Sequence, residues 1–149
     1  MQVIPVQIHE EIEFNDNISE LITSSVELHD GDILVIAQKI ISKQEGRIVK
    51  LSTVTPSLLA KGIGSEYKKN PRIIELILSE SKKIVRMEKG IIIVETKNGF
   101  ICANAGIDES NVKNGFATLL PINSDHSAEM IRKEIKKTCG KEIDRKSVV

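Results

Sequence analysis

The chain has 149 residues, of which 40% are apolar and 28% charged, as in an ordinary globular protein of one domain. Lys and Arg number 21, Asp and Glu also number 21, and only 3% of residues are aromatic, so we expect no nucleic-acid partner. Acidic residues dominate positions 1–38 and basic residues positions 132–146; they form either two solvated faces or a basic end that attracts an anion.

The first third of the chain predicts a strand, a short helix and a second strand. Residues 2–8 are predicted to form an edge strand, because Pro5 has no N–H to donate. A short helix should follow, capped by Asn15 or Asp16 and ending near Ser25. The apolar run ILVIA, residues 33–37, is typical of a strand buried on both faces.

The rest of the chain mixes helices with hairpins. Helices are predicted over residues 56–67, after Pro71 and over residues 127–139, the first weakened by Gly62 and Gly64 and the last closed by Gly140. Strands are predicted over residues 46–51, 83–87, 90–96 and 100–105, with a tight turn at 97–99. This order indicates an α+β fold, a mixed sheet with hairpins and flanking helices.

Several common sites are missing from the sequence. It contains neither of the two common glycine-rich phosphate-binding motifs, and His9 precedes Glu10 and Glu11 without the spacing of a zinc motif. Cys102 lies in an apolar strand, where a packed thiol is favoured over a nucleophile. The two cysteines, the absence of a signal peptide at the N-terminus and the lack of a long apolar run favour a cytoplasmic protein without a membrane span.

Two segments carry candidate chemistry. The first is QKIISKQEGR, residues 38–47, where Lys39 and Lys43 could hold phosphate oxygens as point charges; an exposed basic hairpin is the alternative. The second is GFICANAGIDESNV, residues 99–112, where Asp108 is a hard oxygen ligand suited to Mg²⁺ or Mn²⁺ and Asn111 could contact a nucleotide. A capped turn that enters a short helix is the alternative for the second segment.

Taken together, the two segments resemble the coenzyme F(420)-0:L-glutamate ligase family, also called F(420):γ-glutamyl ligase. The shared motifs, in the family's order, are GDILVIAQKIISKQEGR (31–47), PSLLA (56–60), NPRIIELILSES (70–81), GFICANAGIDESNV (99–112) and LLP (119–121). The resemblance covers a ligase-like domain over residues 1–140 and leaves residues 141–149 as a non-matching polar tail. It implies the N-terminal part of such an enzyme.

The resemblance also implies a reaction and its site. The family joins L-glutamate to a deazaflavin phospholactate through an acyl phosphate, with GTP as a substrate. The reaction uses divalent Mg²⁺ or Mn²⁺ and also K⁺, and the enzyme assembles as a homodimer. The positions that match the family's GTP contacts are Lys43, Asn111, Gln38, Lys39, His9, Glu10, Glu11 and Ile12. Asp108 matches a metal ligand, and the resemblance assigns no catalytic residue.

Beyond the matched region the family continues with an apolar strand that ends in an Asp-Thr pair, which supplies further metal ligands. Here the chain reads KEIDRKSVV instead. Three interpretations follow: a truncated ligase, which we favour, a natural half that needs a partner chain, or a non-catalytic nucleotide-binding or assembly module. Whether these 149 residues are an active enzyme is therefore left open by the sequence.

Overall fold

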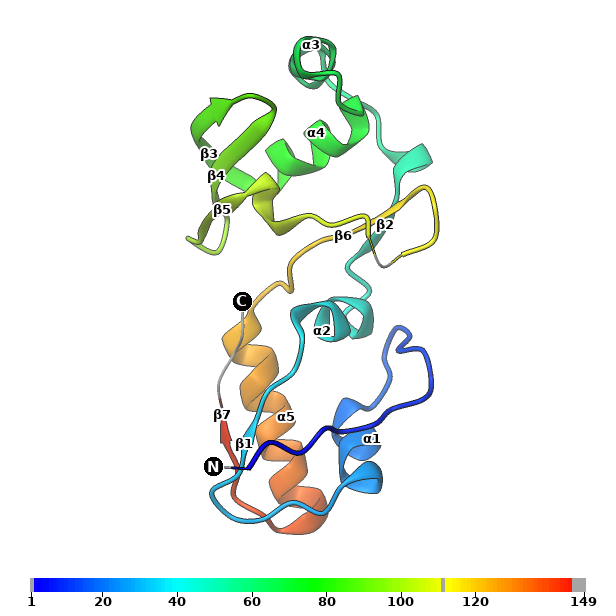
Figure 1. The fold of residues 1–149 in the computed structure, drawn as a ribbon, viewed down its shortest axis with the longest axis vertical. Coiled ribbons are helices and arrows are strands. Elements are labelled where there is room, and N and C mark those ends of the chain that lie inside the picture. The colour runs from blue at the N-terminus through cyan, green and yellow to red at the C-terminus, as the bar shows by residue number, and fades with distance from the viewer. Residues whose placement is uncertain (1, 111, 146–149) are drawn as a thin grey trace. The chain divides into compact units, whose positions relative to one another are not determined.

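The computed structural model describes residues 2–110 and 112–145, and the chain divides into two compact units. Unit 1 combines residues 1–46 with residues 123–149, and unit 2 is the continuous segment 47–122. Helices alternate with short strands in both units (Figure 1). The predicted α+β class with hairpins is therefore confirmed.

Unit 1 is built on a pair of helices. Its elements are α1 (Ile18–Ser25), β1 (Ile33–Leu34), α2 (Gln38–Gln44), α5 (Ser124–Cys139) and β7 (Asp144–Arg145). Helix α1 packs along α5 (Figure 1), and Ile18, Ile22 and Ile135 are buried in the core of this unit. Strands β1 and β7 form a short parallel pair, so the first and last parts of the chain complete the same core.

The structure corrects several expectations in unit 1. Residues 2–8 form no regular strand, and the N-cap of α1 is Asn17, because the Asp16 carboxylate accepts from the backbone N–H of Glu13 instead. Residues 33–37 are not buried on both faces: Leu34 is half-buried, whereas Val35 remains 63% exposed.

Two further corrections concern helices. The segment after β1 is a helix, α2, rather than an exposed basic hairpin. Helix α5 begins at Ser124, three residues before the predicted start, because the side chain of Asn123 caps the N–H of His126. Its end was predicted correctly, since Gly140 takes the left-handed conformation that closes a helix.

Unit 2 places two helices on a three-stranded antiparallel sheet. The sheet has the order β3 (Ser81–Glu88), β4 (Ile91–Thr96) and β5 (Ile101–Ala103). A separate antiparallel pair joins β2 (Ile48–Lys50) to β6 (Phe116–Thr118). The other elements are α3 (Leu58–Tyr67), α4 (Pro71–Ser79) and the 3₁₀ turns η1 (Leu51–Thr53) and η2 (Asn104–Gly106).

The core of unit 2 follows from the amphipathic pattern of α4. A helix was predicted after Pro71, and it is present; the Asn70 side chain caps it and Pro71 occupies its first position. Ile74 and Ile77 then face the sheet, where they pack with Ile92 and form a fully buried cluster. Ser57 is the N-cap of helix α3, which begins at Leu58. Pro56, the predicted start of this helix, therefore lies just outside it.

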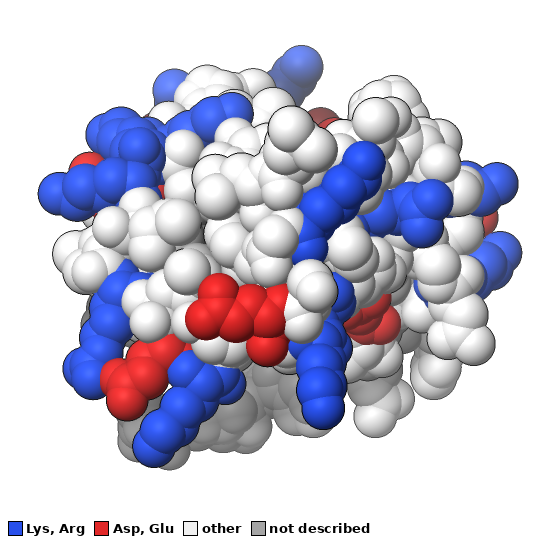
Figure 2. Space-filling model, turned by 90° about the horizontal axis from the view of Figure 1, so that it is seen from above, with Lys and Arg blue, Asp and Glu red and all other residues white. Residues whose placement is uncertain are grey.

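The charges of the two units differ in sign. Unit 2 carries 12 Lys or Arg against 7 Asp or Glu, whereas unit 1 carries 9 against 14. On the face drawn in Figure 2, basic side chains are spread over the surface, with acidic ones between some of them, rather than gathered in one stripe.

Among the described residues, no helix has the length and apolar character needed to cross a bilayer.

Candidate functional site

The structure brings two of the predicted nucleotide-contacting segments together in unit 1. The Nζ of Lys43, on α2, lies 3.0 Å from the Oε1 of Glu11, in the loop that also contains His9 and Glu10. The Lys43 side chain is only 18% exposed, whereas that of Glu11 is 76% exposed. The loop and the helix are thus held by one ion pair, with the carboxylate on its solvent side.

The neighbouring positions differ in what they can offer a ligand. Ile12 is buried in the core of unit 1, so its side chain is withdrawn from any site. On α2, the Nε2 of Gln38 donates to the Oγ of Ser42 at 2.6 Å, one turn further along. Lys39 and Lys43 lie four residues apart and therefore share one face of this helix.

Asp108 is placed in unit 2 by a short β-bridge after the turn η2. Its backbone N–H donates to the carbonyl of Thr118 at 3.1 Å, and its carbonyl accepts from the N–H of Thr118 at 2.8 Å. Its side-chain Oδ1 accepts from the N–H of Ser110 at 3.0 Å, and Oδ2 accepts from the Ser110 hydroxyl at 2.8 Å. The carboxylate is therefore oriented by its own turn.

Asn104, another polar residue of this segment, contacts β4. The Oδ1 of Asn104 accepts from the N–H of Ile92, so this amide is directed at β4. Asn111, the predicted nucleotide contact, lies outside the described residues. Lys43 belongs to unit 1 and Asp108 to unit 2; the likeness of both motifs to one nucleotide site predicts that their side chains face the same cavity.

The donor set for a divalent cation is incomplete in the described part of the chain. No three His, Cys, Asp or Glu side chains are grouped there in a way that could hold a metal ion. Mg²⁺ normally takes one or two carboxylates together with substrate phosphates and waters. Asp108 alone does not constitute such a site, and we derive no chemical step through a metal.

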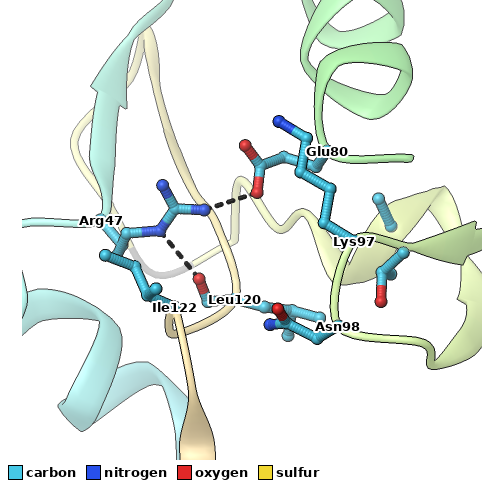
Figure 3. A pocket seen from close by; sticks show the side chains of 8 residues that line it. Arg47, Glu80, Lys97, Asn98, Leu120 and Ile122 are labelled. Carbon is cyan, nitrogen blue, oxygen red and sulfur yellow. Dashed lines mark hydrogen bonds and ion pairs between the residues drawn. The ribbon is translucent and has the colours of Figure 1, made fainter. Parts of the chain in front are cut away.

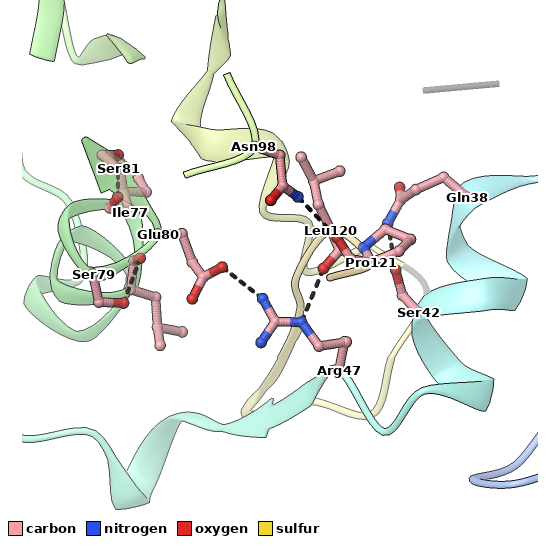
Figure 4. A network of polar contacts seen from close by, with 11 residues as sticks. Gln38, Ser42, Arg47, Ile77, Ser79, Glu80, Ser81, Asn98, Leu120 and Pro121 are labelled. Carbon is pink, nitrogen blue, oxygen red and sulfur yellow. Dashed lines mark hydrogen bonds and ion pairs between the residues drawn. The ribbon is translucent and has the colours of Figure 1, made fainter. Parts of the chain in front are cut away.

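Unit 2 also contains a polar pocket of about 160 Å³ that the sequence did not single out. Its central feature is Arg47, whose Nη2 lies 2.5 Å from the Oε2 of Glu80 and whose Nε donates to the carbonyl of Leu120 at 2.9 Å. Figure 3 shows these groups, and Figure 4 shows the surrounding polar contacts. Thr96, Lys97 and Asn98 complete the polar lining.

Hydrogen bonds join three parts of the chain around this pocket: the end of α4, the turn between β4 and β5, and the segment after β6. The N–H of Lys97 donates to the carbonyl of Glu80, the C-cap residue of α4, at 3.0 Å. The Nδ2 of Asn98 donates to the carbonyl of Pro121 at 3.2 Å (Figure 4). Sequence reasoning missed the pocket because Lys97 and Asn98 look like ordinary hairpin-turn residues. The one usable signal was Arg47, at the end of the SKQEGR motif.

Cys102 remains the packed thiol that its place in the sequence predicts. It lies on β5, half-buried, and burial raises the pKa of its thiol above the ordinary value. A raised pKa keeps the sulfur protonated at neutral pH, which is the opposite of what a nucleophile requires.

Comparison with known proteins identifies relatives of this chain. It matches the family model described as F420-0:Gamma-glutamyl ligase over residues 7–144. A coenzyme F420:L-glutamate ligase from Methanocaldococcus jannaschii is 47% identical over 85% of this chain, and one from Methanothermobacter thermautotrophicus is 46% identical over 86%. A third, from Methanopyrus kandleri, is 38% identical over 96% of the chain.

The matches cover much less of the relatives than of this chain. The aligned region is 57% of the Methanopyrus kandleri protein, 50% of the Methanocaldococcus jannaschii protein and 53% of the Methanothermobacter thermautotrophicus protein. The chain therefore spans about half the length of the curated relatives it matches. Because the family model covers most of this chain, the chain belongs to the F420-0:γ-glutamyl ligase family.

Proposed function

We propose that this chain is the N-terminal part of a GTP-dependent ligase that joins L-glutamate to coenzyme F420-0. The observation that carries the proposal is the identity of 46–47% to two proteins named coenzyme F420:L-glutamate ligase, across both candidate segments. The assignment of GTP and of individual residues rests on the family resemblance of the two motifs.

In the proposed reaction a carboxylate is activated and then joined to an amine. A carboxylate oxygen of the phospholactate attacks the γ-phosphorus of GTP, and GDP leaves. The amine nitrogen of L-glutamate attacks the carbonyl carbon of the resulting acyl phosphate. Inorganic phosphate leaves, the nitrogen loses a proton, and an amide bond remains. Positioning and neutralisation of phosphate charge supply most of the catalysis in such transfers.

Within this chain, Lys43 is the residue best suited to hold GTP phosphate. Its side chain is only 18% exposed and its ammonium is already held beside an exposed loop by Glu11, so a phosphate oxygen can compete with that carboxylate at little cost in ordering. Lys39 on the same helix face and Gln38 at the start of α2 would extend the contact. Asp108 would offer one carboxylate to a divalent cation that neutralises phosphate charge.

A direct test is titration of GTP into the purified 149-residue chain, with Mg²⁺ present. We expect binding that Lys43→Ala weakens about tenfold, since a charge-assisted hydrogen bond contributes roughly 1.5–3 kcal/mol and 1.4 kcal/mol is tenfold. Lys137→Ala, which removes an exposed lysine from α5, is the matched control and should bind like the wild type. Equal binding by both variants would exclude Lys43 from the nucleotide site.

Turnover separates a ligase from a binding module. A ligase releases GDP and phosphate only when coenzyme F420-0 and L-glutamate are both present. The alternative, a non-catalytic nucleotide-binding or assembly module, binds GTP without turnover. Because one carboxylate is a poor site for a phosphate-bridging metal, we expect the 149 residues alone to bind GTP with little or no ligation. Robust ligation would show that they form a complete active site.

A further inference from the structure

The polar pocket of unit 2 has the size of a small amino acid. Its volume is about 160 Å³. Pockets for drug-sized ligands measure about 300–1,000 Å³, so a nucleotide or a deazaflavin is too large to be enclosed here. A free amino acid is small enough.

The charges of the pocket match an acidic amino acid. Its walls carry two cations, Arg47 and Lys97, and one carboxylate, Glu80. L-Glutamate at neutral pH carries the complementary set, two carboxylates and one ammonium group. Asn98 adds an amide whose oxygen can accept a further hydrogen bond.

The polar groups retain capacity for a ligand. The Nε of Arg47 donates to the carbonyl of Leu120, and one Nη donates to Glu80. The other N–H groups of the guanidinium remain available as donors to a ligand. The second oxygen of Glu80 and the Nζ of Lys97 have no partner among the described residues. In Figure 3 the side chains of Arg47 and Lys97 extend to either side of Glu80.

The backbone of the pocket is fixed before any ligand arrives. Lys97 is tied to α4 through the carbonyl of Glu80, Asn98 to the chain at Pro121, and Arg47 to the chain at Leu120. The side chains of Arg47 and Asn98, held in place in this way, lose little conformational entropy on binding. A structural ion pair alone would not require the additional unpaired lysine at its side.

The pocket lies close to Asp108 within the same unit. Ala105 lines it, and Asp108 follows only three positions later in the chain. Three residues span at most about 11 Å even when fully extended, which limits the separation of the two Cα atoms. An amino acid bound here is therefore near the carboxylate that we propose as a metal ligand.

We propose that this pocket binds the acceptor amino acid, L-glutamate, with Glu80 receiving the α-ammonium group and Arg47 and Lys97 receiving carboxylates. This inference rests on the proposed function, because ligation to F420-0 requires a site for that amino acid. It assigns four residues, Arg47, Glu80, Lys97 and Asn98, that the family motifs did not assign.

The test is titration of L-glutamate into the 149-residue chain, followed by NMR chemical shifts. Lys97→Gln removes one cation from an exposed position and should weaken binding about tenfold, as expected for the loss of one charge-assisted hydrogen bond. Lys113→Gln removes an exposed lysine of the same unit that does not line the pocket, and should leave the affinity unchanged. Equal affinities of the two variants, or no binding of L-glutamate by the wild type, would overturn the proposal.

A second ligand tests the role of Glu80 independently of any loss of stability. Glutarate has both carboxylates of L-glutamate but no ammonium group. The wild type should prefer L-glutamate, and Glu80→Gln should weaken L-glutamate without weakening glutarate. If Glu80→Gln weakens both ligands equally, the ammonium assignment is wrong. If that variant does not fold, the wild-type preference for L-glutamate over glutarate still decides the matter.

The same samples distinguish this inference from the proposed function. Lys97→Gln should bind GTP like the wild type, because Lys97 belongs to the amino-acid pocket. Binding of GTP that depends on Lys43, together with no binding of L-glutamate, would overturn the pocket and leave the ligase proposal standing. Binding of L-glutamate that depends on Lys97, without any binding of GTP, would overturn the ligase proposal and leave the pocket as an amino-acid site.

Discussion

Gly106 shows how one residue positions both Asp108 and the pocket. Its φ is +68°, a backbone conformation that residues other than glycine rarely adopt, and Gly106 lies two positions before Asp108. A Cβ at this position would come within 2.7 Å of the side chain of Leu120, which lines the pocket. Glycine is thus required at this turn for two reasons: the positive φ of position 106, and the close approach of Leu120 in the segment that follows β6.

We expect Gly106→Ala to lower the free energy of unfolding by about 2–3 kcal/mol, since the left-handed backbone costs about 1–2 kcal/mol and the contact with Leu120 adds to it. Gly115→Ala is the matched control, because Gly115 has a φ of +88° but no atom within 4 Å of the added Cβ. Urea denaturation measures both. Equal losses in the two variants would show that Leu120 moves aside without cost.

At the scale of elements, the sequence predicts those parts whose signals are local. Each of these signals lies beside the element that it defines: Pro71 at the start of α4, the hairpin turn at 97–99 and the terminal Gly140. All three predictions are confirmed. The prediction that residues 33–37 form a strand buried on both faces was wrong, because a continuous apolar stretch does not reveal which of its faces another part of the fold covers.

The pocket could not be predicted for a related reason. Arg47, Glu80 and Lys97 come from three places in the chain, and only the fold of unit 2 brings them together. Lys43 and Asp108 could be proposed from the sequence because their long motifs resemble those of a family. No local pattern distinguishes Glu80, whose side chain is only 23% exposed, from any other glutamate at a helix end.

Helix α3 contains two glycines with opposite expectations. A Cβ at Gly62 would meet no atom within 4 Å, so Gly62→Ala should raise the free energy of unfolding by about 0.5–1 kcal/mol through its better helix propensity. A Cβ at Gly64 would lie 2.9 Å from the backbone oxygen of Lys69, so Gly64→Ala should be destabilising despite the same gain. Urea denaturation of the pair measures the difference, and two stabilised variants would refute the close packing of the α3–α4 turn.

The start of α3 is linked to α4 by a titratable contact. The Oε2 of Glu75 accepts from the N–H of Ser57 at 2.8 Å. Hydrogen bonds from Ser57, first from its side chain and then from its backbone, lower the pKa of Glu75 below its ordinary value. A lowered pKa in the folded state stabilises the protein above the ordinary glutamate pKa of about 4.3, and this stabilisation is lost as the pH falls through the folded-state value.

We therefore expect Glu75→Gln to unfold more easily than the wild type at pH 7, with a difference that narrows below about pH 4. Glu66→Gln, which changes an exposed glutamate of α3 that has no partner among the described residues, is the control. Urea denaturation at both pH values provides the measurement. A gap that stays constant with pH would mean that the contact does not depend on the charge of Glu75.

At the scale of the whole molecule, the chain has zero net charge at pH 7 and exposes several large apolar side chains. In unit 1, Ile33 is 56% and Val35 63% exposed; they lie two residues apart and so share one side of an extended segment. Exposed apolar strand residues favour pairing with another chain, and a net charge near zero does not oppose it.

We expect the chain to self-associate as its concentration rises. The double change Ile33→Thr and Val35→Thr, which keeps branched side chains but adds hydroxyl groups, should shift this association to higher concentration. Leu58→Gln, at an exposed position of α3 in the other unit, should not. Sedimentation velocity at several concentrations measures the effect. A wild-type monomer at every concentration would contradict the prediction.

The division of unit 1 between residues 1–46 and 123–149 has a consequence for synthesis on the ribosome. Residues 18–22 emerge early, but the helix that covers them, α5, is translated only after the whole of unit 2. At roughly 5–20 residues per second, the early apolar residues wait about 5–20 s for their partner. Unit 2 meets no such delay, because its strands and helices are contiguous in the chain. The nascent segment before Arg47 is therefore the part of this protein that most needs a chaperone.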